Sequence, residues 1–285
     1  MTVFIILGAG GNIGSQVVKS LSEADQPVLA VVHSAEKAKA LEGGAVEAVV
    51  ADVNDSAALR KVFQRGKRAF LLNPPGNVSA DSNAAELATS KSITDALSDS
   101  GLEKIVVAST YGARPGDGIG DLTTLYDFEQ RAKASGIPTA IDRGAYYFTN
   151  LAMLAEPASK GTLPATFAAT MELPMVDPAD LGVVAAERLQ SALDDVGIVY
   201  VEGPERYTFG DVAAAFARHQ GRDVVVKTTP REQLAESFKA IGFSEVSAEA
   251  YARMTEATID ETDLPKLPRR GRITLDAYIA RLTRG

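Results

Sequence analysis

Short runs of apolar and β-branched residues alternate with helical stretches through the first half of the chain. The predicted strands are Thr2–Leu7, Pro27–Val32, Val46–Ala51, Arg68–Leu72, Lys104–Ala108 and Pro138–Asp142. Several of them are apolar at nearly every position, which is typical of a parallel sheet with helices on both faces. The alternation is that of successive βαβ units, so it predicts an α/β fold with a doubly wound parallel sheet.

The rhythm changes after Asn150, where prolines and glycines divide the chain into short elements before a helix that begins near Pro178. Gly197–Val201 could add one more strand to the main sheet. We therefore predict a large domain and a smaller C-terminal α/β lobe. The large domain would comprise residues 1–150 and 175–203, and the lobe would comprise residues 151–174 and 204–285.

The composition is that of an ordinary globular protein, with 46% hydrophobic and 23% charged residues in 285. A net charge of -8 disfavours nucleic-acid binding, because phosphate neutralisation needs clustered cations. The cationic stretch Lys266–Arg272 is interpreted as a solvated face near a terminus. With 285 residues, the chain is long enough to bury a sizeable core.

Several kinds of site and location are disfavoured by what the sequence lacks. There is no cysteine, and two histidines, His33 and His219, have no spacing that suits a metal cluster or a serine triad, so no metal site is expected. The first residues read as a strand and not as a signal peptide, and no segment approaches the roughly 20 apolar residues of a membrane span. We expect a cytoplasmic protein that does not enter a membrane.

A glycine-rich turn follows the first predicted strand and leads into the amphipathic stretch Ser15–Ser22. Strand, glycine turn and helix in this order form a Rossmann-type phosphate site, in which main-chain N–H groups at the helix start meet a pyrophosphate. The spacing is GxxGxxG, and a purely structural turn is the alternative. The residues of the predicted site are Gly8, Gly10, Gly11, Asn12, Ile13 and Gly14.

The end of the second strand bears on the choice between NAD and NADP. An acidic residue there would bind the ribose 2′-hydroxyl and repel a 2′-phosphate, but the chain has His33 and Ser34. Lys37 lies one turn into the next helix and could attract the phosphate; alternatively, it is a solvated helix residue and Ser34 is its N-cap. NADP is favoured, and NAD stays possible.

Three ordered segments, Gly8–Gly14, His33–Leu41 and Ala134–Asn150, resemble the NmrA-like branch of the atypical short-chain dehydrogenases. That group includes type-2 quinone oxidoreductases, triphenylmethane-dye reductases and redox-sensing regulators that bind NADP without turnover. The resemblance spans most of the chain, and it implies a nicotinamide dinucleotide as the cofactor.

Carried over position by position, the resemblance also implies roles for residues outside the glycine turn. His33 and Lys37 would lie at the 2′ position, although relatives commonly have arginine in place of His33, which makes dual use of NAD and NADP plausible. Asp52 and Val53 would contact the adenine, Asn73 and Pro74 the ribose and nicotinamide, and Ser109 the nicotinamide. Purely structural roles are the alternatives: an ordinary Pro-Pro-Gly loop after Asn73, and local backbone hydrogen bonding for Ser109.

No catalytic acid is evident. Short-chain dehydrogenases use a tyrosine with a lysine four residues later, and none of the eight tyrosines has one. Many NmrA-like relatives keep a lysine four residues before a glutamate; with Glu129 in that place, this chain has Leu125. Quinones and cationic dyes can accept hydride without such a pair, since the charge spreads over a ring or neutralises a cation, so we predict no catalytic residue.

Aromatic residues follow the carboxyl ends of the last two predicted strands, where ligands of open α/β sheets bind. We expect them to form a stacking pocket for a planar small-molecule acceptor, with core packing between the two lobes as the alternative. The predicted pocket residues are Tyr111, Tyr146, Tyr147, Phe148 and Asn150.

Two hypotheses follow. The first is an NADPH-preferring oxidoreductase that transfers hydride to a quinone or a similar conjugated acceptor. The second is a non-catalytic NADP-binding regulator that acts through a protein partner. The chain could be a monomer or a homodimer under either hypothesis.

Overall fold

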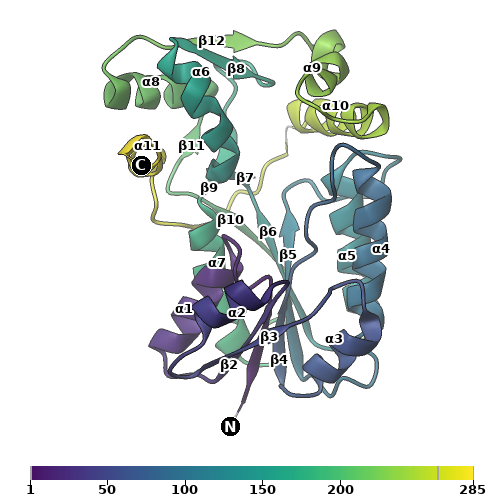
Figure 1. Cartoon of the computed structure of the whole chain (residues 1–285). Coiled ribbons are helices and arrows are strands. Elements are labelled where there is room, and N and C mark those ends of the chain that lie inside the picture. The colour runs from purple at the N-terminus through teal and green to yellow at the C-terminus, as the bar shows by residue number, and fades with distance from the viewer. Residues whose placement is uncertain (1, 262, 285) are drawn as a thin grey trace.

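A single eight-stranded parallel sheet dominates the computed structural model, which describes residues 2–261 and 263–284 (Figure 1). The strand order is β13-β10-β6-β5-β4-β1-β2-β3, and every neighbouring pair is parallel. The strands are β1 (Phe4–Leu7), β2 (Val28–Val32), β3 (Val46–Val50), β4 (Arg68–Leu71), β5 (Lys104–Thr110), β6 (Thr139–Gly144), β10 (Gly197–Glu202) and β13 (Arg269–Arg270). The α/β, Rossmann-type doubly wound fold predicted from the sequence is confirmed.

The strand order reverses at β1, which pairs with β2 on one side and with β4 on the other. The connections after β1 and after β4 therefore run to opposite sides of this point, and the carboxyl ends of the two strands open toward a crevice. Ligands of doubly wound sheets bind at such a switch point. The fold thus puts the glycine turn after β1 at the place where a dinucleotide is expected.

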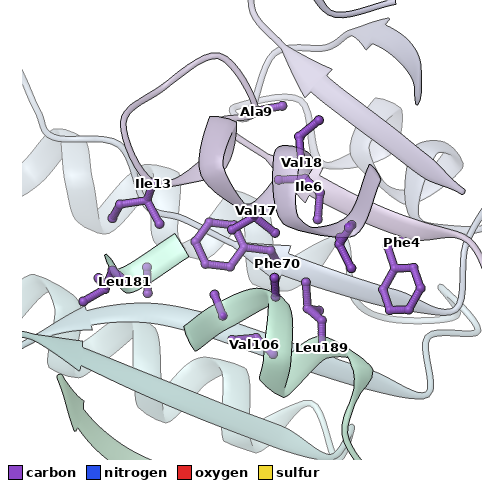
Figure 2. Packing of buried hydrophobic residues seen from close by; sticks show 14 of the residues in the cluster. Phe4, Ile6, Ala9, Ile13, Val17, Val18, Phe70, Val106, Leu181 and Leu189 are labelled. Carbon is purple, nitrogen blue, oxygen red and sulfur yellow. The ribbon is translucent and has the colours of Figure 1, made fainter. Parts of the chain in front are cut away.

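Helices cover both faces of the sheet, and each layer closes a separate hydrophobic core. One layer consists of α1 (Gly14–Glu23), α2 (Ala35–Leu41) and α7 (Pro178–Gln190), and the other of α3 (Ser56–Phe63), α4 (Ser82–Asp95) and α5 (Asp121–Ala134). Figure 2 shows the first core, in which Phe70 of β4 lies between Val17 of α1 and the residues of α7. Strands buried on both sides explain why their sequences are almost wholly apolar.

A smaller lobe covers the end of the sheet toward which β5 runs (Figure 1). It contains two short sheets, β7-β9-β11 and β8-β12, and its core is formed mainly by aromatic and aliphatic residues. The strands are β7 (Tyr146–Tyr147), β8 (Thr162–Ala165), β9 (Leu173–Val176), β11 (Arg206–Tyr207) and β12 (Val225–Thr228); the helices are α6 (Ala155–Ser159), α8 (Phe209–Gln220), α9 (Leu234–Ala240), α10 (Glu245–Ile259) and α11 (Leu275–Arg284), with a 3-10 helix at Phe148–Leu154. None of the helices in the described parts of the chain is both long and apolar enough to cross a membrane.

Helix α10 joins this lobe to the start of α4. The Ser247 hydroxyl donates to the carbonyl oxygen of Ala80 at 2.6 Å and lies 3.1 Å from the Ser82 hydroxyl. The Ser244 N–H donates to the carbonyl oxygen of Val78 at 2.8 Å. These bonds hold α10 over the loop that connects β4 with α4, so the lobe forms a wall beside the carboxyl end of β4.

The segment that contains β13 differs from its expected place. The sequence predicts that residues 204–285 belong to the smaller lobe, but Arg269 and Arg270 pair with the end of β10 at the edge of the main sheet. Arg270 donates to the buried carboxylate of Glu202 at 2.8 Å, and Asp180 accepts the main-chain N–H groups of the two residues after Gly271. Part of the cationic stretch near the terminus is therefore an edge strand of the sheet.

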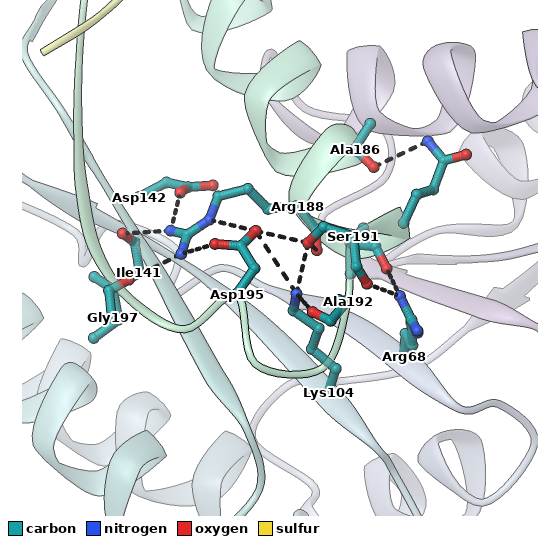
Figure 3. A network of polar contacts seen from close by, with 12 residues as sticks. Arg68, Lys104, Ile141, Asp142, Ala186, Arg188, Ser191, Ala192, Asp195 and Gly197 are labelled. Atoms are coloured by element: carbon teal, nitrogen blue, oxygen red, sulfur yellow. Dashed lines mark hydrogen bonds and ion pairs between the residues drawn. The ribbon is translucent and has the colours of Figure 1, made fainter.

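A network of charged side chains lies at the opposite end of the sheet from the glycine turn, where β4 and β5 begin (Figure 3). The guanidinium of Arg188, which is 2% exposed, donates to Asp142 at 2.8 Å and to Asp195 at 3.1 Å. Lys104, also fully buried, donates to the hydroxyl of Ser191 at 2.7 Å, and burial lowers its pKa. The network ties the end of α7 to β4, β5, β6 and β10, and its position makes it structural.

Candidate active site

The glycine turn after β1 has a geometry that only glycine satisfies at its two ends. Gly8 has a φ of 64°, in the left-handed region, and a Cβ on Gly14 would lie 2.2 Å from the carbonyl oxygen of Gly8. Gly11 closes the turn by donating its N–H to the same oxygen at 2.9 Å. The first turn of α1 therefore rests directly on the chain that leaves β1.

The turn presents main-chain donors to an anion. Within residues 2–261 and 263–284, no acceptor is found for the N–H groups of Gly10, Asn12, Ile13 and Gly14. Gly10, Gly11 and Asn12 are exposed, and no side chain caps the start of α1. Unpaired N–H groups at a helix start carry a partial positive charge, so these residues fit a pyrophosphate.

Helix α7 packs against the glycine turn and the start of α1. A Cβ on Gly182 would lie 2.7 Å from the carbonyl oxygen of Ile13 and 2.7 Å from Cβ of Gln16, so α7 and α1 are in close contact at this point. Ile13 is buried, 6% exposed, with its side chain in the core (Figure 2). Ile13 thus shapes the turn from inside, while its neighbours Gly11 and Asn12 face outward.

His33 and Lys37 lie beside the turn on the β2 side. Both side chains are exposed, and a Cβ on Gly10 would be 3.0 Å from Cδ of Lys37, so the lysine stem lies over the glycine turn. Ser34 is the N-cap of α2 and accepts the N–H of Lys37 at 3.3 Å. The structure thus shows Ser34 as the cap of α2, and it leaves the role of Lys37 at the turn as a prediction.

The loop after β3 is fixed by side-chain hydrogen bonds. Asp52, which is exposed, accepts the main-chain N–H of Asn54 at 2.9 Å, and the amide oxygen of Asn54 accepts the hydroxyl of Thr89 at 2.8 Å. Val53 is partly buried against the core under α3 and α4. Asp52 and Val53 therefore lie in an ordered loop at the carboxyl end of β3, the strand that pairs with β2.

Asn73 and Pro74 follow β4 and are held by Glu86 of α4. The Asn73 amide donates to the carbonyl oxygen of Glu86 at 3.1 Å, and the Gly76 N–H donates to the Glu86 carboxylate at 2.8 Å. Asn73 is 7% exposed, yet its own oxygen Oδ1 has no hydrogen-bond partner among the described residues. A buried acceptor without a donor is costly in a folded protein, so this oxygen is suited to meet a donor group of a ligand.

Ser109 at the end of β5 is bonded to a buried ion pair. Its hydroxyl donates to Glu129 at 2.5 Å, and Glu129 accepts two hydrogen bonds of 2.8 Å from the guanidinium of Arg143. Glu129 has no exposed surface. Leu125, one turn earlier in α5, packs partly buried against the core and places no charge there. Glu129 is thus neutralised by Arg143 and not by a lysine of its own helix.

Tyr111 lies on the other side of this ion pair. Its hydroxyl donates to the buried carboxylate of Glu202 at 2.8 Å, and its ring meets that of Tyr200 edge-on at 5.1 Å. Burial first, and the bond to Glu202 second, raise the pKa of Tyr111 far above its usual value. Tyr111, Arg143 and Tyr200 line a small cavity of about 150 Å³. The side chain of Tyr111 is thus fixed against the end of β10.

The four predicted pocket residues after β6 divide into two groups. Tyr146 and Tyr147 are half-buried, and Asn150 is exposed. Burial raises the pKa of Tyr146 to about 12, so its hydroxyl stays protonated. Phe148 has no exposed surface and packs against Tyr207 and Tyr278, so it belongs to the core of the lobe and is out of an acceptor's reach.

A carboxylate pair near this region was not anticipated from the sequence. Glu86 of α4 and Asp121, the first residue of α5, interact electrostatically, and Tyr251 of α10 also interacts with Asp121. Burial, and to a smaller extent the charge of Asp121, raise the pKa of Tyr147 above its usual value. These side chains come from separate helices of both lobes, and no spacing in the sequence connects them.

Comparisons with known proteins agree with this picture. A model of the NmrA-like family matches residues 2–275. The NAD(P)H azoreductase of Xenophilus azovorans is 24% identical over 249 residues, which are 87% of this chain and 84% of that protein.

Two solved structures share the fold over almost the whole chain. The NADPH-dependent quinone oxidoreductase of Escherichia coli, complexed with NADPH, has a TM-score of 0.79 at 21% identity and covers 98% of this chain and 99% of its own. The triphenylmethane reductase of Citrobacter sp. has a TM-score of 0.81 at 19% identity and covers 100% of both chains. At these identities the likeness establishes the fold, and the chemistry has to be argued from the site.

Proposed function

The chain belongs to the NmrA-like family, and on this premise we propose that it is an NAD(P)H-dependent oxidoreductase that prefers NADPH and reduces a quinone or a similar planar conjugated acceptor. The observation that carries the proposal is the glycine turn at the switch point of the sheet. Its N–H groups at Gly10, Asn12, Ile13 and Gly14 have no acceptor in the part of the chain that the structure describes, which suits the binding of a diphosphate. The names of the azoreductase and quinone oxidoreductase relatives support the same class of activity.

The residues of the large domain would hold the cofactor. The turn from Gly8 to Gly14 would bind the pyrophosphate, His33 and Lys37 the 2′-phosphate, and Asp52 and Val53 the adenine. Asn73, Pro74 and Ser109 would lie along the ribose and nicotinamide at the ends of β4 and β5. When bound, the reduced nicotinamide supplies a hydride.

The acceptor would enter beside the residues that follow β6. Tyr146, Tyr147 and Asn150 have surface available there, and the smaller lobe adds the wall formed by α10. A planar ring that stacks on the nicotinamide needs proximity and exclusion of water more than it needs a Tyr/Lys pair, because its own conjugation spreads the incoming charge.

The first test is the oxidation of NADPH, followed at its absorbance band, against a panel of quinones, azo dyes, cationic triphenylmethane dyes and simple aldehydes. We expect turnover with the conjugated acceptors and none with the aldehydes, since no Tyr/Lys pair protonates an alkoxide. If NADPH binds tightly and no acceptor is reduced, the oxidoreductase proposal fails, and a regulator that reads out NADP through a protein partner takes its place.

Replacing His33 with aspartate tests the cofactor preference. A carboxylate at this position repels a 2′-phosphate and can accept the ribose 2′-hydroxyl of NAD, so His33→Asp should weaken NADPH binding by about 10- to 100-fold, or about 1.4 to 2.8 kcal/mol, and affect NADH much less. The measurement is the dissociation constant of each cofactor from fluorescence titration. His33→Asn removes the imidazole without adding charge and is the matched control. Equal effects of His33→Asp on both cofactors would discredit the assigned 2′ site.

A further inference from the structure

The first residue of α5, Asp121, places a carboxyl group in an unusual setting. Its oxygen Oδ1 has no accessible surface and no hydrogen-bond partner among the described residues. The titratable groups that face it are Glu86 from α4, Tyr251 from α10 and Tyr147 from β7. None of these groups is a cation. Tyr251 and a main-chain hydrogen bond favour the charged form of Asp121, but burial and the charge of Glu86 oppose it more strongly.

Glu86, in contrast, is well provided with donors. Its two carboxylate oxygens accept the Gly76 N–H at 2.8 Å and the Thr124 hydroxyl at 2.6 Å, and the residue is 3% exposed. Unlike Asp121, whose Oδ1 has no partner among the described residues, Glu86 thus has a donor on each carboxylate oxygen. Its negative charge and the burial of the site then oppose the ionisation of Asp121, with burial as the larger cause, and raise the pKa of Asp121 to about 7.

The group adjoins the residues that would flank the nicotinamide and the acceptor. Asn73, at the end of β4, is bonded to the main chain of Glu86, and its Oδ1 is the second buried oxygen without a partner at this place. Tyr147 is one of the two half-buried tyrosines after β6 and interacts electrostatically with Asp121. Asn73 and Asp121 come from two chain segments, both interact with Glu86, and each carries a buried oxygen without a partner among the described residues. Such a place is suited to exchange protons or hydrogen bonds with a ligand.

We propose that Asp121, which lies beside Glu86 of α4 and Tyr251 of α10, is the proton donor for the reduced acceptor. The inference rests on the proposed function and assigns it an acid that the motifs of the sequence do not contain. The acceptors that need this residue are quinones and azo compounds, in which a heteroatom must be protonated.

A quinone takes up a hydride, two electrons and one hydrogen nucleus, from the reduced nicotinamide dinucleotide and becomes a hydroquinone monoanion. The O–H bond of Asp121 breaks, a new O–H bond forms on the monoanion, and the carboxylate regains its proton from water. An azo group is reduced in the same way with N–H bonds. A cationic triphenylmethane dye differs, because the hydride forms a C–H bond and neutralises the cation, so no proton is needed.

This difference gives an internal comparison for Asp121→Asn. The variant should reduce quinones and azo dyes with a kcat at least 100-fold lower, as expected for loss of a general acid, and should reduce a cationic triphenylmethane dye at the wild-type rate with an unchanged Kd for NADPH. Asp117→Asn, an exposed aspartate in the loop before α5, is the matched control and should change neither rate.

The outcomes separate the inference from the proposed function. If wild-type protein reduces none of the acceptors, the proposed function fails. If wild-type protein reduces them and Asp121→Asn slows all of them alike, or none of them, Asp121 is not the proton donor.

A second readout needs neither cofactor nor turnover. An aspartate with a folded-state pKa of about 7 binds its proton more tightly folded than unfolded, so it lowers the stability of the fold as pH rises from about 4 to 7. Asp121→Asn removes this titration. Its melting temperature should exceed that of the wild type at pH 8 and should match it at pH 4. If the melting temperature of Asp121→Asn does not exceed that of the wild type at pH 8, the raised pKa of Asp121 is wrong and the proposal fails.

Discussion

The variant Gly14→Ala is expected to bind NADPH at least 100-fold more weakly than the wild type, a loss of about 2.7 kcal/mol or more. An alanine Cβ would lie 2.2 Å from the carbonyl oxygen of Gly8 and 2.7 Å from its carbon, and both atoms belong to the main chain. No side-chain movement can relieve the contact, so the turn and the start of α1 must separate. The N–H groups that would meet the pyrophosphate then lose their common direction.

The measurements are the NADPH dissociation constant by fluorescence titration and the free energy of unfolding by urea denaturation. We expect the variant to lose about 1 to 3 kcal/mol of stability as well, as for other overpacked positions. Lys19→Ala, an exposed position in the same helix, is the control and should leave both quantities unchanged. A folded Gly14→Ala protein that binds NADPH as the wild type does would mean that the cofactor lies elsewhere.

Prediction from the sequence succeeded where the determinants are local. Strands buried on both faces have uninterrupted apolar runs, and the turn from Gly8 to Gly14 needs its glycines for reasons that act within a few residues. The helix that begins at Pro178 is likewise marked by an N-cap at Asp177 and a proline in its first turn. Each of these signals depends on neighbours in the chain.

Elements defined by distant partners were missed. The strand β13 is two residues long and carries two arginines, a composition that indicates a solvated segment. What makes it a strand is the end of β10, where the Glu202 carboxylate pairs with Arg270 and its carbonyl oxygen accepts the N–H of Gly271. Nothing within the stretch itself carries that information.

The candidate site shows the same division. The glycine turn could be predicted residue by residue, whereas Asp121, Glu86 and Tyr251 are brought together by the packing of α4, α5 and α10. Phe148 illustrates the opposite error: it follows a strand end as a pocket residue would, but the 3-10 helix that starts there turns its ring into the core of the lobe. The sequence indicates that Phe148 follows a strand end, but the direction of its ring depends on the helix that begins there.

The buried network at the other end of the sheet should respond most strongly to Arg188→Met. Methionine keeps much of the volume but removes the donors, leaving the carboxylate of Asp142, 1% exposed, without its cation. Removing one member of a buried ion pair costs about 3 to 5 kcal/mol, because the remaining charge is neither paired nor hydrated. Arg188 also donates to the carbonyl oxygens of Ile141 and Gly197, which lose these bonds too.

The loss should depend on pH in a defined direction. Burial raises the pKa of Asp142 to about 6 even though Arg188 opposes the shift, so without Arg188 the pKa rises further. Folded Asp142 then binds a proton that the unfolded chain releases near pH 4, and the destabilisation grows as pH rises above that point. The free energy of unfolding of Arg188→Met, measured with urea, should therefore fall further below the wild-type value at pH 8 than at pH 5. Arg218→Met, at an exposed arginine bonded to Asp276, is the matched control and should cost less than about 1 kcal/mol at both values. If Arg188→Met loses as little unfolding free energy as Arg218→Met, the Arg188–Asp142 pair adds no net stability to the sheet.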